Sequence, residues 1–278
     1  FTGNITYSLS GDDSASFEVI NGQLKLKSDV SADFESKNTY SINITATDDA
    51  NHETSVNFTL QVTDANDSPT AIELSANNID ENTEGMTVGI LSTSDVDAED
   101  DHTYTLSGAN AASFEVINGE LKLKTDVAVN YETNSTLAIT ITATDTGGLT
   151  TTQSFTVMVN DLNDAPTLTD TLADQAVDED SEFSFTIPNN TFSDEDNDAL
   201  SYSVALNDGS PLPAWISFDA DSRTLSGTPL NGDVGSINIK VTATDKAGIA
   251  VSDAFLINVA NTNDAPTAIV LSANLIEE

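Results

Sequence analysis

The sequence repeats itself at a fixed interval, and this repeat constrains the fold more than any other feature. The segment SFEVINGQLKLKSDV beginning at Ser16 recurs as SFEVINGELKLKTDV beginning at Ser113, an offset of 97 residues. A third copy diverges in its interior but keeps its ends, because ATD at 143–145 returns at 243–245, an offset of 100. A unit of about 100 residues is the size of a small domain and too long for a solenoid repeat. We therefore expect tandem domains.

Alternating apolar and polar residues predict β-strands in every unit. The clearest runs cover residues 40–46 and 58–62 in the first unit, 137–143 and 155–159 in the second, and 237–243 and 255–259 in the third. Period-two alternation is typical of antiparallel sheets with one buried face. Asn-Gly at 21–22 and at 118–119 favours tight hairpins. No amphipathic helix of three turns is evident. The predicted fold class is all-β, with tandem Greek-key, immunoglobulin-like β-sandwiches arranged end to end.

The same offsets give the expected domain boundaries. The first unit lacks its opening strands, because Phe1 aligns with Ala98 of the second unit. We expect an incomplete unit, a complete unit, a third unit and the start of a further one, at residues 1–67, 68–164, 165–264 and 265–278. The sequence is expected to be part of a longer chain.

The C-terminal segment carries the opening sequence of a unit. TAIVLSANLIEE from Thr267 repeats TAIELSANNIDE from Thr70. An opening strand without its own sheet leaves an unpaired edge. We expect this segment to be either loosely ordered or paired with a neighbouring molecule.

Charge and composition exclude several classes of partner. The chain has 46 acidic and 8 basic residues, a formal net charge of −38. Nucleic acids and anionic membrane surfaces need clusters of Lys and Arg, so both are poor partners. The absence of cysteine removes disulfides, thiolate catalysis and thiolate zinc sites. No apolar stretch approaches the ~20 residues of a membrane span, so membrane insertion is not expected.

Acidic residues concentrate at the joints between units. The linkers read DANDSP at 64–69, DLNDAP at 161–166 and NTNDAP at 261–266. Each joint between sandwiches brings together a pole of one domain and the start of the next. Carboxylates are therefore expected to converge there from the acidic loops DFE and NYE, from the linkers, from DVD and DED, and from the ATD strand ends.

These motifs resemble those of the cadherin repeat. The resemblance covers DFE at 33–35, NYE at 130–132, the linkers, DVD at 95–97, ATD at 143–145 and Glu81 in DENTEG. The third unit resembles instead the dystroglycan-type cadherin-like domain common in bacterial surface proteins, through FSDEDNDALSYSV, LPAWISFD, LSGTP and VTATDKAG. Bacterial examples occur in large secreted adhesins of the repeat-in-toxin type. The resemblance implies an extracellular protein at a bacterial cell surface, anchored elsewhere in the full-length chain.

The resemblance also implies several calcium ions at the domain junctions, holding successive domains in line. The implied metal ligands are Asp33, Glu35, Asp64, Asn66, Asp67, Asp95, Asp97, Asp145, Glu81, Glu132, Asp161, Asn163, Asp164, Asp194, Asp196 and Asp245. Calcium takes six to eight oxygen ligands of these types. Two carboxylates ~4 Å apart repel by about 1 kcal/mol even in water, so a joint without calcium would splay and a joint with it would stiffen.

Some residues depart from the family pattern, and one other interpretation stays open. The first joint lacks an opening glutamate, Asn130 replaces an acidic residue, and the third joint begins with Asn261, with Glu179 and Asn263 as its expected remnants. An EF-hand is excluded, since Ala199 and Ala205 stand where that loop needs Gly and Glu. Solvated turns remain the alternative for any single acidic pair.

Catalysis is not expected. His52 and His102 lie in unlike contexts, and both are expected to be solvated surface residues. Asp178 and Asp180 could in principle run glycoside hydrolysis, but aromatic residues make up only 6% of the chain. Trp215, the sole tryptophan, is expected in a sandwich core.

The leading hypothesis is a calcium-rigidified structural segment of an adhesin that projects a distal binding domain. The alternative is a ligand-binding module in the third unit, which would recognise a peptide or a cell-surface glycan. A hydrolase accessory domain is a weaker third hypothesis. Calcium and neighbouring repeats of the same long chain are the expected partners.

Overall fold

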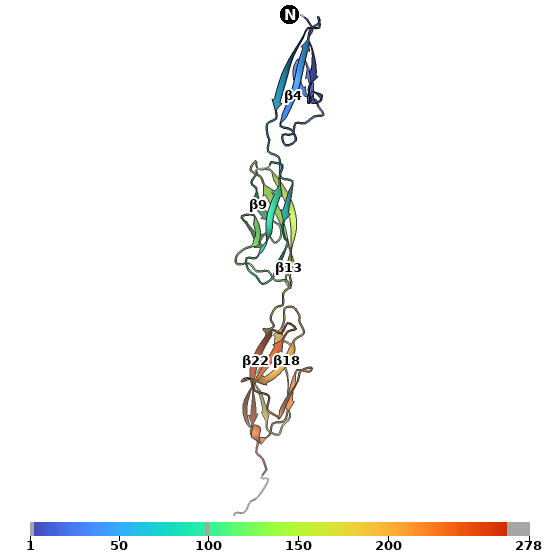
Figure 1. Ribbon diagram of the computed structural model, residues 1–278. Coiled ribbons are helices and arrows are strands. Elements are labelled where there is room, and N and C mark those ends of the chain that lie inside the picture. The colour runs from blue at the N-terminus through green and yellow to red at the C-terminus, as the bar shows by residue number, and fades with distance from the viewer. Residues whose placement is uncertain (1–2, 98–99, 266–278) are drawn as a thin grey trace, which may run out of the picture. The chain divides into compact units, whose positions relative to one another are not determined.

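Nearly every regular element of the chain is a β-strand. The computed structural model describes residues 3–97 and 100–265 (Figure 1). The helical elements in these ranges are three short 3-10 turns, η1 (Ser14–Ser16), η2 (Ala111–Ser113) and η3 (Asn231–Asp233). The contacts divide the chain into two compact units, residues 1–160 and residues 161–278, which we describe separately.

The N-terminal segment of the first unit has one sheet and one hairpin. The sheet has the order β1-β4-β5, from β1 (Thr6–Ser10), β4 (Thr39–Thr47) and β5 (Glu53–Gln61). The hairpin joins β2 (Phe17–Ile20) to β3 (Gln23–Leu26). Asn21 and Gly22 between these strands have φ values of 52° and 73°, the left-handed conformation that the predicted Asn-Gly turn requires. The small core contains Phe17, Tyr40 and Ile42.

The rest of the first unit is a complete two-sheet sandwich. One sheet has the order β10-β11-β8-β6, from β6 (Ala71–Leu74), β8 (Thr87–Ser94), β10 (Phe114–Ile117) and β11 (Glu120–Leu123). The other has the order β7-β13-β12-β9, from β7 (Asn78–Asp80), β9 (Thr103–Ser107), β12 (Thr136–Thr144) and β13 (Thr150–Asn160). The alternating residues Leu137, Ile139 and Ile141 all point into the core between the sheets.

The second unit contains another sandwich. Its larger sheet has the order β15-β22-β21-β18, from β15 (Gln175–Asp178), β18 (Ser201–Leu206), β21 (Gly235–Thr244) and β22 (Ala250–Ala260). A second sheet has the order β16-β20-β19, from β16 (Phe183–Thr186), β19 (Ile216–Asp219) and β20 (Thr224–Gly227). A short pair joins β14 (Thr167–Leu168) to β17 (Phe192–Ser193). Trp215 is partly buried and packs against this core, edge-to-face with Phe183 at 6.1 Å between centroids, in agreement with the prediction that it contributes to a sandwich core.

The predicted all-β class and the tandem sandwiches are confirmed. The predicted domain boundaries stay predictions, and the opening strand expected within 267–278 lies outside the described residues. No helix among the described residues is long and apolar enough to cross a lipid bilayer.

Candidate metal centre

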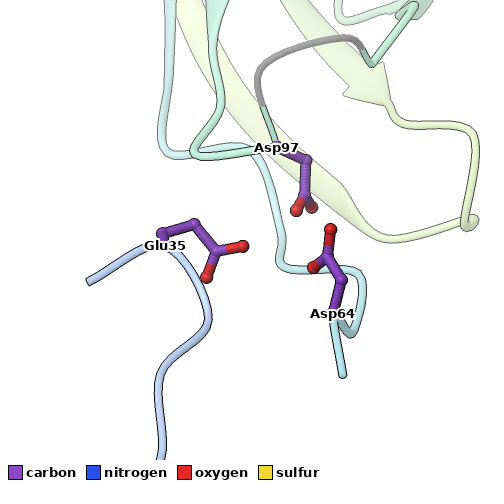
Figure 2. A group of neighbouring side chains, drawn as sticks. All are labelled: Glu35, Asp64 and Asp97. Atoms are coloured by element: carbon purple, nitrogen blue, oxygen red, sulfur yellow. The ribbon is translucent and has the colours of Figure 1, made fainter. Parts of the chain in front are cut away.

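Three carboxylates converge near the linker of the first unit. Glu35 lies in the loop between β3 and β4, Asp64 follows β5, and Asp97 follows β8. Figure 2 shows their carboxylate groups turned toward one another, and one oxygen of each lies within 4.8 Å of the others. These side chains line a depression of about 810 Å³. A cation could bind there to all three carboxylates.

The charges in this group repel one another. A hydrogen bond from the Glu35 backbone amide is the largest single influence on the Glu35 side chain and lowers its pKa. Desolvation and the negative charges of Asp64, Asp67 and Asp97 act in the opposite direction, and the net result is a raised pKa. The ionised form of Glu35 is thus disfavoured until positive charge enters the group.

The linker is hydrogen-bonded to the complete sandwich of the same unit. The side-chain amide of Asn66 donates to Oδ2 of Asp145 over 3.0 Å, and the backbone amide of Asp67 donates to Oδ2 of Asp97 over 2.8 Å. Asp145 is buried at the end of β12. Its burial, the largest influence, would raise its pKa, but the hydrogen bonds from Asn66 and from the Leu149 amide outweigh burial and lower it.

A second acidic group lies beside the first. Asp95, Asp100 and Asp145 each place one oxygen within 4.8 Å of the others. Asp100 accepts a hydrogen bond from the Thr146 hydroxyl through Oδ1, while its Oδ2 is buried and has no hydrogen-bond partner among the described residues. Asp100 was not among the predicted ligands. The run DVDAEDD contained it, but the sequence did not show which of these carboxylates turns inward.

Asp33 takes a different position from the one its motif suggests. The backbone amide and the hydroxyl of Ser36 both donate to its carboxylate, at 2.9 Å each. These bonds lower the pKa of Asp33. The structure therefore places Asp33 in a turn of its own loop, apart from the group formed by Glu35, Asp64 and Asp97.

The second unit repeats the linker contacts of the first. The amide of Asn163 donates to Oδ2 of Asp245 over 3.0 Å, and the backbone amide of Asp164 donates to Oδ2 of Asp196 over 2.8 Å. The Asn163 bond is the largest influence on Asp245 and lowers its pKa. The same pair of contacts has thus formed in two sandwiches whose interior sequences differ.

Three carboxylates of the second unit form a group with unsatisfied oxygens. Asp194, Asp196 and Asp198 each place one oxygen within 4.8 Å of the others. Oδ2 of Asp194, Oδ1 of Asp196 and Oδ2 of Asp198 are buried without a hydrogen-bond partner among the described residues. The Asp198 side chain is only 7% exposed, and its other oxygen pairs with Lys246 over 2.8 Å. Asp198, like Asp100, was not predicted as a ligand.

The predicted glutamates are placed differently from one another. Glu81 is fully buried and accepts a hydrogen bond from the Tyr131 amide over 2.7 Å. Glu132 of the first unit and Asp161 of the second are exposed. Glu179 is buried near the end of the second sandwich, where the Thr262 amide donates to its Oε1 over 2.7 Å and Asn261 donates to the same oxygen. The assignment of Glu179 and Asn263 as remnants of a site at the third joint stays a prediction.

The prediction for His102 is wrong. Its side chain is 10% exposed, and its Nε2 lies 3.0 Å from Oδ2 of Asp95, a side chain that is 4% exposed. The position directly after DVDAEDD was the one available signal, because an imidazole there can reach an inward-turned carboxylate. His52 is 83% exposed, in agreement with the prediction.

The residues of these groups fit a hard divalent cation. Buried carboxylate oxygens without partners cost free energy, and several of them at one place also repel. All candidate ligand atoms are carboxylate or amide oxygens, which calcium binds more readily than softer metals do. One lysine, Lys246, partly balances the group in the second unit.

Comparisons with known proteins agree with this fold. Residues 165–260 match the family model described as a putative Ig domain. The chain is similar to a protocadherin gammaB7 EC3–6 structure, described as a cis-dimer, with 25% identity, a TM-score of 0.67 and coverage of 92% of this chain and 66% of that one. It is similar to extracellular cadherin domains 1–5 of protocadherin gamma B2 (21% identity, TM-score 0.69, coverage 94% and 53%).

A third similar structure is mouse cadherin-23 EC22–24, with 18% identity, a TM-score of 0.65 and coverage of 93% of this chain and 86% of that one. The chain thus spans about half to two thirds of the length of the two protocadherin structures. Residues 165–260 contain an Ig-like domain, and the chain as a whole has the fold of tandem cadherin-like β-sandwiches.

Proposed function

We propose that this chain is a calcium-binding extender segment of a bacterial cell-surface adhesin, in which Ca²⁺ at the linkers stiffens consecutive sandwiches. One observation carries the proposal. The two linker contacts, Asn66 to Asp145 and Asn163 to Asp245, are equivalent and each stands beside a group of converging carboxylates. Solvated turns would not leave buried carboxylate oxygens without hydrogen-bond partners.

The ligands follow from the groups described above. At the first joint the ion-binding residues would be Glu35, Asp64, Asn66, Asp67, Asp95, Asp97, Asp100 and Asp145. By the repeat, the linker of the second unit would use Asp161, Asn163, Asp164, Asp194, Asp196, Asp198 and Asp245, while Glu81 and Glu132 of the first unit stay ligands predicted from the sequence. Bound calcium supplies positive charge and accepts six to eight oxygen ligands. Asp33 is left out, because both of its oxygens accept hydrogen bonds from Ser36.

The chain's own residues would act in two ways. Asn66 and Asp67 hold the linker on the following sandwich through hydrogen bonds that need no ion. Glu35 belongs to the preceding segment, and, against the hydrogen bond from its own backbone amide, desolvation and the charges of its acidic neighbours raise its pKa. Calcium would neutralise the repulsion within this group and hold Glu35 to the linker, so the joint would stiffen when calcium binds.

Solution scattering in calcium and in EDTA tests the proposal. We expect larger maximum dimensions and a narrower distribution of shapes in calcium. Asp67→Ala and Asp164→Ala should each lower the calcium stoichiometry or affinity in isothermal titration, whereas Asp126→Ala, which removes an exposed carboxylate that belongs to none of the acidic groups above, should not. Superimposable scattering profiles would refute stiffening, and unchanged titrations would remove the linkers from the sites.

The location and the absence of catalysis belong to the same proposal. Cadherin-like sandwiches are typically structural domains, and the long acidic chain suits an extracellular environment rich in calcium. The charge of −38 opposes contact with nucleic acid. We therefore place the segment outside the cell, as a spacer and not an enzyme.

A second candidate function rests on a depression in the second unit. This depression of about 700 Å³ is lined in part by Phe192, Tyr202, Arg223, Asp194 and Asp198. The guanidinium of Arg223 lies over the Tyr202 ring, 5.6 Å from its centroid. A peptide or glycan could bind to such a mixed aromatic and charged surface. Retention of a glycan or peptide on an array, abolished by Arg223→Gln, would support this function, and an array without binders would oppose it.

A further inference from the structure

The residue that follows the ATD motif makes the same contact in both complete sandwiches but differs in charge. Thr146 and Lys246 each stand directly after this motif, at the repeat offset of 100. The Thr146 hydroxyl donates a hydrogen bond to Oδ1 of Asp100. The Lys246 ammonium group donates one to Oδ1 of Asp198 over 2.8 Å. A neutral donor in the first unit is therefore replaced by a cation in the second.

The carboxylates that accept these hydrogen bonds occupy equivalent positions in the two units. Asp100 lies three residues before the start of β9, and Asp198 lies three residues before the start of β18. Both of these strands pair with the strand that carries the ATD motif. In each unit, Oδ2 of this carboxylate is buried without a hydrogen-bond partner among the described residues. The two units thus differ here in the donor and not in the acceptor.

Lys246 interacts with more than one carboxylate of the second unit. Its hydrogen bond to Asp198 is the largest influence on its pKa and raises it, and the charges of Asp198 and Asp196 also raise it against desolvation. The Asp198 side chain is only 7% exposed, whereas the Lys246 side chain is 78% exposed. The ammonium group therefore lies at the solvent side of the acidic group, and the buried oxygens of Asp194, Asp196 and Asp198 keep no partner among the residues that the structure describes.

The corresponding group of the first unit has no such cation. Within residues 3–97 and 100–265, no lysine or arginine pairs with Asp95, Asp100 or Asp145. The imidazole of His102 contacts Asp95, and histidine carries a charge only when it is protonated. At this position, a bound ion would have to supply the positive charge that Lys246 supplies in the second unit.

We propose that the residue after the ATD motif sets the calcium affinity of its linker, with Lys246 as a built-in counter-ion of the second unit. The ammonium group balances part of the charge of Asp194, Asp196 and Asp198 without an ion, and it repels a divalent cation that binds beside it. Lys246 therefore stabilises the calcium-free linker and weakens calcium binding, whereas Thr146 makes the same hydrogen bond and adds no charge. This inference rests on the proposed function, because it concerns the same calcium sites.

Lys246→Thr tests the proposal in the full chain, because it gives the second unit the neutral donor of the first. Urea unfolding followed by Trp215 fluorescence reports the second unit, and it is repeated over a series of calcium concentrations at moderate salt and about pH 8. In EDTA, the variant should unfold at a lower urea concentration than the wild type. Its unfolding midpoint should begin to rise at an about tenfold lower calcium concentration, since the repelling unit charge is gone.

Two further variants control for net charge and for position. Lys240→Thr removes the same charge from the same unit, but this lysine lies on β21 opposite Ala205 and Ala254. It should leave the calcium concentration at which the midpoint rises unchanged. Thr146→Lys adds the charge to the first unit and should weaken one class of calcium sites about tenfold in isothermal titration. The calcium response of Trp215 should stay that of the wild type in this variant.

The outcomes separate this proposal from the proposed function. If Lys246→Thr responded to calcium at the same or a higher concentration than the wild type, or if Lys240→Thr gave an equal change, the proposal would be overturned and the calcium sites would stand. If calcium stabilised neither the wild type nor Lys246→Thr, the calcium site of the second linker and this proposal would both fail. If calcium stabilised only Lys246→Thr, the lysine would be confirmed as the counter-ion and calcium would be removed from the wild-type second linker.

Discussion

Replacing Asp196 by asparagine should change the stability of the second unit differently with and without calcium. In the group of Asp194, Asp196 and Asp198, one oxygen of each lies within 4.8 Å of the others. A pair of unit charges at that distance repels by about 0.9 kcal/mol in bulk water and about 3.5 kcal/mol at an effective dielectric constant of 20. Asp196→Asn removes two of the three repelling pairs.

Without calcium, the variant should be more stable than the wild type. The two removed pairs give about 2 kcal/mol at the bulk-water limit, which is a lower bound because three oxygens of the group are buried, although Lys246 offsets part of its charge. The asparagine carbonyl can still accept the hydrogen bond from Asp164. Its amide group would take the place of Oδ1, a buried atom without a partner among the described residues, and could donate to a neighbouring carboxylate.

With calcium, the variant should gain less stability than the wild type. A ligand at 100 times its dissociation constant stabilises a fold by about 2.7 kcal/mol. If the loss of one charged ligand weakens binding tenfold, the same calcium concentration stabilises the variant by about 1.4 kcal/mol, so the gain falls by about 1.3 kcal/mol. The variant should therefore be more stable than the wild type in EDTA, but calcium should stabilise it less than it stabilises the wild type.

The assay is urea unfolding followed by the fluorescence of Trp215. Trp215 is the sole tryptophan and packs against the core of the second unit, so it reports that unit within the full chain. Glu182→Gln removes an exposed charge from the same unit and is the matched control. A variant less stable than wild type in EDTA would show that Asp196 acts mainly as a hydrogen-bond acceptor. If Glu182→Gln changed the stability in EDTA and in calcium by the same amounts, the changes would be due to net charge alone.

Three other predictions concern the core and the titration of the site. Leu121→Ala should cost about 2–5 kcal/mol by circular dichroism, and the equivalent Leu24→Ala clearly less, because Leu24 is only partly buried; equal costs would contradict this. Because the pKa of Asp245 is lowered in the folded state, this carboxylate stabilises the fold at pH values above its ordinary pKa of 3.8, and the stabilisation is lost as the pH falls through the folded-state pKa. Asn163→Ala should shrink this acid-dependent loss of stability, measured by Trp215 fluorescence. Because the pKa of Glu35 is raised in the folded state, its contribution to stability is fully present below pH 4.5 and is lost as the pH rises through the folded-state pKa. Glu35→Gln should abolish this loss of stability in melting curves recorded in EDTA.

The sequence predicted the strands but not every pairing. The alternation at 137–143 falls within β12, and the Asn-Gly turn at 118–119 has the expected positive φ values. The parallel pairing of β7 with β13 could not be predicted. β7 has three residues, too few for a periodic signal, and its position depends on the tertiary core that buries Ile79.

The site was predictable to the level of its motifs. Asp97 and Asp145 meet the linker as expected, since strand ends and linkers share a pole of the sandwich. Asp100 and Asp198 were missed because a run of acidic residues has no period that tells inward from outward side chains. The turn at Asp33 could have been recognised, because aspartate commonly accepts hydrogen bonds from residues two or three positions further along the chain.

The hydrogen bonds also indicate which side of the joint calcium would act on. Asn66 and Asp67 are already attached to the following sandwich, through Asp145 and Asp97. Glu35 alone represents the preceding segment in its acidic group, and desolvation and the charges of its neighbours raise its pKa. Cation binding would therefore change chiefly the attachment of Glu35, and any hinge of the calcium-free joint should lie before Asn66. Hydrogen exchange at residues 63–65 should slow on adding calcium, while exchange at the Asp67 amide should already be slow in EDTA. Fast exchange of that amide in EDTA would show that the linker is held by the ion and not by its hydrogen bonds.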